Sequence, residues 1–325
     1  MTESTPAHRP AVSVIIAVHD GAEHIRTALD SVLASTWRDL ELILVDDASS
    51  DDTVAVARAC VDPRLSVHVL PENVGVAGAR DAGAARSAGE YLWFVDADDS
   101  VPATGLEALV RCAQRSGADV VIGASTVVGG SSRAPTTTSV RWTGTDALRA
   151  MLLGEIRGQL WDKLIAGRIV RAVEIPRSRV HSDVALVSRC LAASTSVVRI
   201  EDLVYTYTVR SDSIIGSARR RADSLRTVER VVADAAVSAG VDPGREIAYY
   251  RARFIGLSMI RDAAAGGYSR RDASALLAEA RRRIGLRALR LSARRREWRV
   301  GATLLLAALW PRAFVLARRW ARVRR

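Results

Sequence analysis

Acidic side chains follow two strongly apolar stretches in the first hundred residues, in a pattern suited to metal binding. Asp46 and Asp47 come directly after LELILV, and Asp96 and Asp98 come directly after YLWFV. Two carboxylates spaced as D-x-D on a turn can converge on one cation, and Mg²⁺ and Mn²⁺ prefer such hard oxygen ligands. We therefore interpret Asp96 and Asp98 as ligands of Mn²⁺ or Mg²⁺. The alternative is that these acids, together with Asp99, are solvated loop residues or helix caps.

The turn after the first apolar stretch, VSVIIAV, lacks the glycines that cradle a phosphate. It reads Val18-His19-Asp20-Gly21-Ala22, whereas a dinucleotide-binding fold would place G-x-G-x-x-G there. A diphosphate ligand without that cradle needs another source of positive charge. A divalent cation held by carboxylates would supply it.

Alternating strands and helices must position these side chains. Continuous apolar, β-branched runs are typical of strands buried on both faces of a parallel sheet. Apolar residues at helical spacing, such as Ile25, Leu29, Val32 and Leu33, separate the runs. The alternation predicts an α/β fold with right-handed crossovers, in which ligands bind beyond the carboxyl ends of the strands. Strands are predicted at 12–18, 40–45, 65–70, 91–95 and 119–123, with later helices ending near Cys60 and covering 76–88 and 103–115.

The pattern changes after the fifth predicted strand. Residues 129–139, rich in Gly, Ser and Thr, predict a surface loop or hairpin. Shorter elements are predicted at 161–166, 183–193, 196–200 and 203–209, and only helices from about 217 onward. We expect a flexible N-terminus over 1–10, an α/β domain over 11–215 and a basic helical region over 216–325.

The charge distribution argues against a nucleic-acid enzyme. The formal net charge is +11, but residues 1–215 carry 21 basic and 27 acidic residues, whereas residues 216–325 carry 26 and 9. A nucleic-acid enzyme would be expected to surround its cleft with positive charge. Here the predicted cleft lies in the acidic part, so we expect no nucleic-acid partner. The three cysteines have no close spacing and are interpreted as buried apolar residues in a reducing compartment.

Two blocks of this sequence resemble the family-2 glycosyltransferases of the GT-A fold, of the bacterial polysaccharide or cell-envelope type. The first is VSVIIAVHDGAEHIRTALDSVLASTWRDLELILVDDASSDDT, and the second is ENVGVAGARDAGAARSAGEYLWFVDADDSV. The match continues through Trp161-Asp162-Lys163-Leu164 and ends with the Tyr205-x-Tyr207-x-x-Arg210-x-x-Ser213 stretch. The resemblance implies a mainly parallel sheet flanked by helices, followed by a helical extension. It also implies transfer of a sugar from a nucleotide-diphosphate donor, such as a UDP-sugar, to a glycan or lipid-linked acceptor hydroxyl.

The resemblance also implies individual roles. Asp183 falls where inverting members carry the catalytic base. Trp161 and Lys163 we interpret as residues that shape or pack the acceptor side and do not react. The residues matched to donor binding are Ala17, Val18, His19 and Asp20 along the base and ribose, Asp46 at the base, Arg80 near the donor, Arg210 at the departing diphosphate, and Asp96 and Asp98 at the metal. The alternative for Arg210 is a structural ion pair.

Four positions depart from the family pattern. The family has Pro where Ala17 stands, an aromatic residue and Asn where His19 and Asp20 stand, and Glu where Ser182 stands. The alternative for Asp183 is an N-terminal acid of a helix beginning near Val184, favoured there by the helix dipole. His181, two residues earlier, is interpreted as a polar loop residue.

The C-terminal segment combines apolar and basic residues. The run VGATLLLAALWP at 300–311 is uncharged but shorter than the ~20 residues that span a bilayer. Flanking arginines and tryptophans favour a helix lying at a membrane surface over 298–325, the alternative being a helix packed on its own domain or on a partner. The polar N-terminus predicts no secretory signal. We therefore expect a cytoplasmic protein, peripheral at the inner face of the cell membrane.

Two other functions fit parts of the pattern. A sugar-1-phosphate nucleotidyltransferase also combines an α/β sheet with a metal, but its first loop carries basic residues that Ala17 to Ala22 lack. A non-catalytic nucleotide-sugar or polysaccharide-binding subunit is left open by Ser182 at the Glu position.

Overall fold

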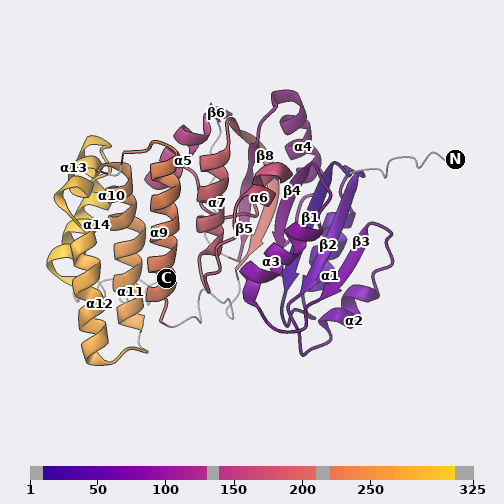
Figure 1. Ribbon diagram of the computed structural model, residues 1–325, viewed down its shortest axis with the longest axis horizontal. Coiled ribbons are helices and arrows are strands. Elements are labelled where there is room, and N and C mark those ends of the chain that lie inside the picture. The colour runs from indigo at the N-terminus through magenta and orange to yellow at the C-terminus, as the bar shows by residue number, and fades with distance from the viewer. Residues whose placement is uncertain (1–9, 130–138, 210–219, 243, 266, 312–325) are drawn as a thin grey trace. The chain divides into compact units, whose positions relative to one another are not determined.

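The computed structural model describes residues 10–129, 139–209, 220–242, 244–265 and 267–311 (Figure 1). It divides into two compact units. We call Met1–Gly144, Gln159–Arg177 and Ala193–Arg210 the sheet unit, and Thr145–Gly158, Ser178–Ala192 and Ser211–Arg325 the helical unit. The domain boundary near residue 215 stays a prediction.

The sheet unit is built on a mixed eight-stranded sheet in the order β3-β2-β1-β4-β7-β5-β8-β6. Neighbouring strands β3, β2, β1 and β4 are parallel, as are β5 and β8, whereas β7 is antiparallel to both β4 and β5. The mainly parallel sheet flanked by helices is therefore confirmed. The strands are β1 (Val12–Val18), β2 (Leu40–Asp46), β3 (Leu65–Val69), β4 (Tyr91–Asp96), β5 (Val120–Val128), β6 (Val140–Trp142), β7 (Lys163–Ala166) and β8 (Val197–Thr208).

The core of this unit follows the apolar patterns of the sequence. The central strands β1, β2 and β4 are buried along almost their whole length, as continuous β-branched runs require. Helix α1 buries Ile25, Leu29, Val32 and Leu33, the four positions predicted from their spacing. The other helices of this unit are α2 (Thr53–Arg58), α3 (Gly75–Arg86), α4 (Gly105–Ser116) and α6 (Gly167–Ala172), and α1 covers Ile25–Leu33.

Helix α3 lies unusually close to the sheet because of a glycine. A Cβ added at Gly83 would come within 2.5 Å of the Ile15 side chain in β1. The small residues of this helix therefore let its backbone approach β1 and β2, which fixes the position of the longer side chains that α3 carries.

One predicted pair of strands is a single strand. The sequence predicts separate strands at 196–200 and 203–209, but β8 runs without a break from Val197 to Thr208. Its pairing with β5 shifts register between Ile122 and Ser125, and over this stretch β8 contributes more residues than β5 does. A bulge of this kind keeps the exposed polar pair Glu201 and Asp202 inside a continuous strand.

The described part of the helical unit consists of helices and the loops that join them, with no strand. Figure 1 shows α9, α11 and α12 side by side. The helices are α5 (Gly144–Leu153), α7 (Ser182–Ala193), α9 (Ala222–Ser238), α10 (Glu246–Tyr250), a π-helical segment (Arg251–Gly256), α11 (Leu257–Ala265), α12 (Arg270–Arg283), α13 (Leu286–Arg294) and α14 (Trp298–Leu309), with α5 and α7 each extending one residue beyond the unit. In the part of the chain that is described, none of these helices has both the length and the apolar character that crossing a bilayer requires.

Candidate active site

Three strand ends bring the predicted donor-binding residues together. Strand β1 lies between β2 and β4, with Val18 opposite Asp46 and Ala17 opposite Asp96. The carboxyl ends of all three strands therefore lie at one edge of the sheet. That edge is where an open parallel sheet binds its ligands.

Asp46 presents a buried acceptor toward this edge. Its side chain is fully buried, and Oδ2 accepts a hydrogen bond from the Ser49 amide at 3.0 Å. Oδ1 has no hydrogen-bond partner among the residues that the structure describes. Buried polar atoms are nearly always paired in native proteins, so this oxygen is a place where a ligand can supply a donor.

The loop after β1 is tied to the loop after β2. His19 Nδ1 lies 2.9 Å from the Asp47 carbonyl oxygen, and the Gly21 amide donates to Thr53 Oγ1. Asp20 has a φ of +50°, a conformation that Asp and Asn tolerate better than most residues, and it accepts from the Ser50 amide at 2.7 Å. That backbone hydrogen bond lowers the pKa of Asp20. Asp20 thus holds a turn that the family builds with Asn.

Asp47 anchors the start of α3. Its carboxylate accepts from the backbone amides of Val74 and Gly75, both at 2.8 Å, and Gly75 has a φ of +79°. These amides belong to the helix terminus, where a carboxylate also interacts favourably with the dipole. The sequence shows Asp47 only as an acid at a strand end, and its capping role depends on a contact 27 residues away.

Helix α3 carries Arg80 to the end of β4. Arg80 is 5% exposed, and its Nη2 donates to Asp96 Oδ1 at 2.7 Å. A buried guanidinium paired with a carboxylate favours the ionised form of both groups. Arg80 thus lies beside the D-x-D sequence, and its role near the donor stays a prediction.

The D-x-D turn is fixed to β8 by Asp99. Tyr205 Oη donates to Asp99 Oδ2 at 2.8 Å and accepts from the Asp96 amide, while the Thr208 amide donates to Asp99 Oδ1. The N-cap of α4 is Thr104, so the idea that Asp99 caps the following helix is wrong. Its partners are more than a hundred residues away, beyond the reach of local patterns.

Aromatic stacking holds Tyr205, the hydrogen-bond partner of Asp99, in place. Trp161 stacks on Tyr205 with ring centroids 4.5 Å apart, and on Tyr207 at 6.0 Å. Lys163 is fully buried, and its Nζ donates to Asp162 Oδ1 at 2.5 Å. The side chains of Trp161 and Lys163 are therefore packing groups in the sheet unit.

The donor set at this edge fits a hard divalent cation. No group of three or more His, Cys, Asp or Glu side chains able to hold a metal was found in the described part of the chain. Mg²⁺ and similar ions in phosphate-transfer sites are held by one or two carboxylates plus substrate phosphates. Asp96 and Asp98 supply that number of carboxylates, with Asp96 still 29% exposed beside Arg80.

The predicted base lies in the helical unit. Helix α7 begins at Ser182, so Asp183 is in its first turn and is partly exposed. His181, just before the helix, has a φ of +62°, and burial lowers its pKa. The first-turn position suits an acid through the helix dipole as well as a catalytic role. Arg210 lies outside the described residues.

Comparison with solved structures gives the class of this fold. The crystal structure of S. aureus TarS residues 1–349 in complex with UDP-GlcNAc superposes with a TM-score of 0.72 and 17% identity. The match covers 91% of this chain and 90% of that chain. The sheet and its helices thus have a GT-A-like fold.

Sequence comparison gives the family. Residues 13–169 match the model of glycosyl transferase family 2. The cholesterol galactosyltransferase of Borreliella burgdorferi is 27% identical over 245 residues, which cover 69% of this chain and 68% of that protein. The succinoglycan biosynthesis protein ExoO of Rhizobium meliloti is 34% identical over 113 residues, 35% of this chain and 32% of its own. Residues 13–169 are therefore a glycosyl transferase family 2 domain, and the chain is a glycosyltransferase.

Burial of Asp99 predicts a pH-dependent stability. Burial, opposed by the hydrogen bonds from Thr208 and Tyr205, raises the pKa of Asp99 from 3.8 to about 7. Between those values the folded state holds the proton and the unfolded state has lost it, so the free energy of unfolding should fall as pH rises. Asp99→Asn should remove this component. Denaturant unfolding in EDTA at several pH values would measure the difference between the two proteins.

The expected result is that the wild type loses stability relative to Asp99→Asn from about pH 4 to about pH 7. Asp202→Asn, an exposed acid on β8, is the control and should follow the wild type. Parallel curves for the wild type and Asp99→Asn would contradict a raised pKa.

Proposed function

We propose that this glycosyltransferase moves a sugar from a nucleotide-diphosphate donor, a UDP-sugar, to an acceptor hydroxyl with inversion and with a divalent cation. The observation that carries the proposal is the group formed by Asp96, Asp98 and Arg80 where β1, β2 and β4 end. The complex of the fold relative TarS with UDP-GlcNAc supports the choice of donor.

Each donor-side residue has a task that its surroundings suit. The unpartnered Oδ1 of Asp46 accepts a hydrogen bond from the nucleotide base. The main chain and side chains from Ala17 to Asp20 line the base and ribose. Arg80 pairs with Asp96 beside the metal ligands, and Arg210 is proposed to neutralise the departing diphosphate.

Asp96 and Asp98 would hold Mn²⁺ or Mg²⁺. When bound, the cation stabilises the negative charge that grows on the leaving nucleoside diphosphate. The protein's part is to place the two carboxylates, and the tie between Asp99 and Tyr205 fixes the turn on which they stand.

Asp183 is the proposed general base. It takes the proton from the acceptor hydroxyl as that oxygen attacks the anomeric carbon in one in-line displacement. Positioned bases of this kind typically contribute ~10²–10⁴-fold to rate. Ser182, in place of the family's Glu, leaves this carboxylate without an acidic neighbour on its N-terminal side.

The proposed setting is the synthesis of cell-envelope or extracellular polysaccharide, on a glycan or lipid-linked acceptor. The names of the succinoglycan biosynthesis protein ExoO and of the cholesterol galactosyltransferase support acceptors of these two kinds.

A donor-turnover assay with and without Mn²⁺ separates this function from its alternatives. Release of nucleoside diphosphate supports the transferase. Pyrophosphate formed from a nucleoside triphosphate would indicate a nucleotidyltransferase, and absence of turnover would indicate a binding subunit.

The metal proposal predicts the effect of Asp98→Ala. Loss of one of two protein ligands should lower turnover by about 10²-fold or more, the usual effect of removing electrostatic stabilisation of the transition state. It should also remove the Mn²⁺ dependence of UDP binding measured by calorimetry. Asp202→Ala, which removes an exposed acid from the same unit, should change neither. Full activity of Asp98→Ala, or of the wild type in excess EDTA, would contradict the proposal that the enzyme needs a divalent cation.

The base proposal predicts the effect of Asp183→Asn. Turnover should fall by at least ~10²-fold while the affinity for UDP changes little, because the base acts on the acceptor proton. Asp223→Asn is the matched control, since Asp223 is also a first-turn acid, in α9. If Asp183→Asn lowered the melting temperature and kept its rate, Asp183 would be a helix-terminus acid only.

We further propose that the C-terminal segment 298–325 attaches the protein to the inner face of the membrane. Within α14, Trp298, Leu305 and Leu309 are exposed, as is Trp310 directly after it. Residues 312–325 lie outside the described residues.

The membrane proposal predicts that anionic liposomes retain the full chain, less so at high salt, because basic residues contribute ~1 kcal/mol each near an anionic leaflet. A chain lacking 298–325 should stay in solution with its fold intact, and its unfolding would show that the segment belongs to the core.

A further inference from the structure

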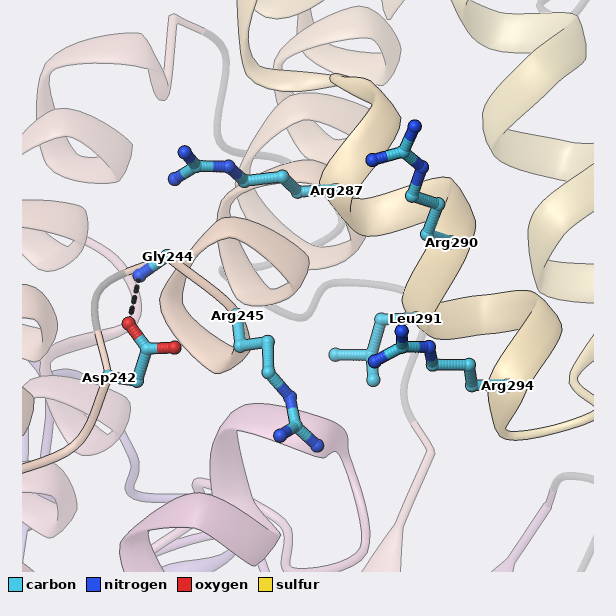
Figure 2. A pocket seen from close by; sticks show the side chains of 7 residues that line it. All are labelled: Asp242, Gly244, Arg245, Arg287, Arg290, Leu291 and Arg294. Atoms are coloured by element: carbon cyan, nitrogen blue, oxygen red, sulfur yellow. Dashed lines mark hydrogen bonds between the residues drawn. The ribbon is translucent and has the colours of Figure 1, made fainter.

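An arginine-lined pocket lies in the helical unit, apart from every residue assigned above. It has a volume of about 370 Å³ and is lined by Asp242, Gly244, Arg245, Arg287, Arg290, Leu291 and Arg294. That volume falls within the ~300–1,000 Å³ of sites that bind small molecules. Figure 2 shows Arg287 and Arg294 extending from α13 toward the side on which Gly244 and Arg245 lie.

The spacing of the α13 arginines places them on one face. Arg287, Arg290 and Arg294 follow one another at intervals of three and four residues, and all three are exposed. Residues at these intervals are neighbours on a helix surface. Buried Ala288 and Leu291 pack α13 against the unit, and Leu291 also lines the pocket between the arginines, so the backbone that carries them is fixed.

These arginines lack the acidic partners that others in the unit have. Among the described residues, no ion pair or hydrogen bond joins Arg287, Arg290 or Arg294 to a carboxylate, and Arg245 approaches Glu246 at 3.8 Å with 59% of its side chain exposed. By contrast, three glutamates of the unit each form salt bridges with two arginines. Glu279 pairs with Arg226 and Arg283, Glu229 with Arg251 and Arg283, and Glu297 with Arg253 and Arg295. Three arginines of α13 that have no acidic partner among the described residues therefore line one hollow together with Arg245.

The acidic member of the lining is already engaged. Asp242 Oδ1 accepts from the Gly244 amide at 2.8 Å. A Cβ added at Gly244 would lie 3.1 Å from Arg287 Nη1, so the glycine leaves room for that guanidinium beside the backbone. Four arginines against one aspartate give the pocket a net charge of +3. Like charges around one hollow repel, and a bound anion would relieve that repulsion.

We propose that this pocket binds an anion that carries two or more phosphate groups. Guanidinium groups present planar pairs of N–H donors that match phosphate oxygens, and several of them on fixed positions suit a ligand with several phosphates. The source is either the phosphate of a lipid headgroup or a water-soluble phosphate compound. The site is independent of glycosyl transfer, because none of its residues belongs to the proposed donor or base machinery.

Direct binding tests the proposal on the full chain. Tripolyphosphate, titrated by calorimetry, is the soluble probe, and vesicles of phosphatidylcholine with cardiolipin, whose headgroup carries two phosphates, are the lipid probe. The triple variant Arg287→Gln, Arg290→Gln, Arg294→Gln removes three charges from the pocket. Arg270→Gln, Arg271→Gln, Arg282→Gln is the control, since it removes three exposed arginines from α12 in the same unit.

We expect the pocket variant to bind at least one probe about tenfold or more weakly, as the loss of charge-assisted hydrogen bonds implies, and the control to stay within about twofold of the wild type. An effect on tripolyphosphate identifies a soluble phosphate compound, and an effect on vesicles alone identifies a lipid headgroup. Equal weakening in both variants would reduce the site to general surface charge. Failure of the wild type to bind either probe would overturn the proposal.

A charge-preserving variant tests whether the guanidinium groups themselves are needed. Lysine at positions 287, 290 and 294 keeps the positive charge and loses the paired donors, so its binding should be a few-fold weaker than that of the wild type. Binding equal to the wild type would refute recognition by guanidinium groups. Circular dichroism of all three variants checks that the helices are intact.

Discussion

The salt bridge between Arg80 and Asp96 is the contact on which the candidate site depends. Asp46, Asp96 and Asp98 are gathered by neighbouring strand ends, and carboxylates brought together in a partly buried place repel one another. The buried guanidinium of Arg80 offsets that repulsion. Arg80 reaches Asp96 because Gly83 lets α3 approach the sheet and Asp47 holds the start of that helix. The acidic edge and the helix packed beside it are thus parts of one arrangement.

Local patterns in the sequence predicted the parts of the sheet unit that depend on neighbouring residues. Strands β1 to β5 and the buried face of α1 follow from apolar spacing alone, although β5 continues to Val128, beyond the predicted 119–123. The parallel order of β1, β2 and β4 places their acids at one edge. The family blocks then identified the class of enzyme. None of this required knowledge of long-range contacts.

The features that the sequence did not predict depend on residues far apart in the chain. Asp99 is held by Tyr205, 106 residues later, and no spacing rule joins the two. Strand β8 continues through Glu201 and Asp202 because a bulge accommodates them, which the change from apolar to polar residues conceals. The arginine pocket likewise requires α10 and α13 to meet, and the high arginine content of the segment hides which of its arginines have acidic partners.

The placement of β7 has a consequence for how the nascent chain is protected. Strand β4 pairs with β1 on one side and with β7 on the other, and β7 begins only at Lys163. Until those residues leave the ribosome, the apolar strand YLWFVD presents one unpaired edge, the kind of edge that invites pairing with another chain. The stretch of roughly seventy residues between the two strands therefore sets a period of vulnerability during synthesis. Antiparallel β7 ends that period by closing the gap between β4 and β5.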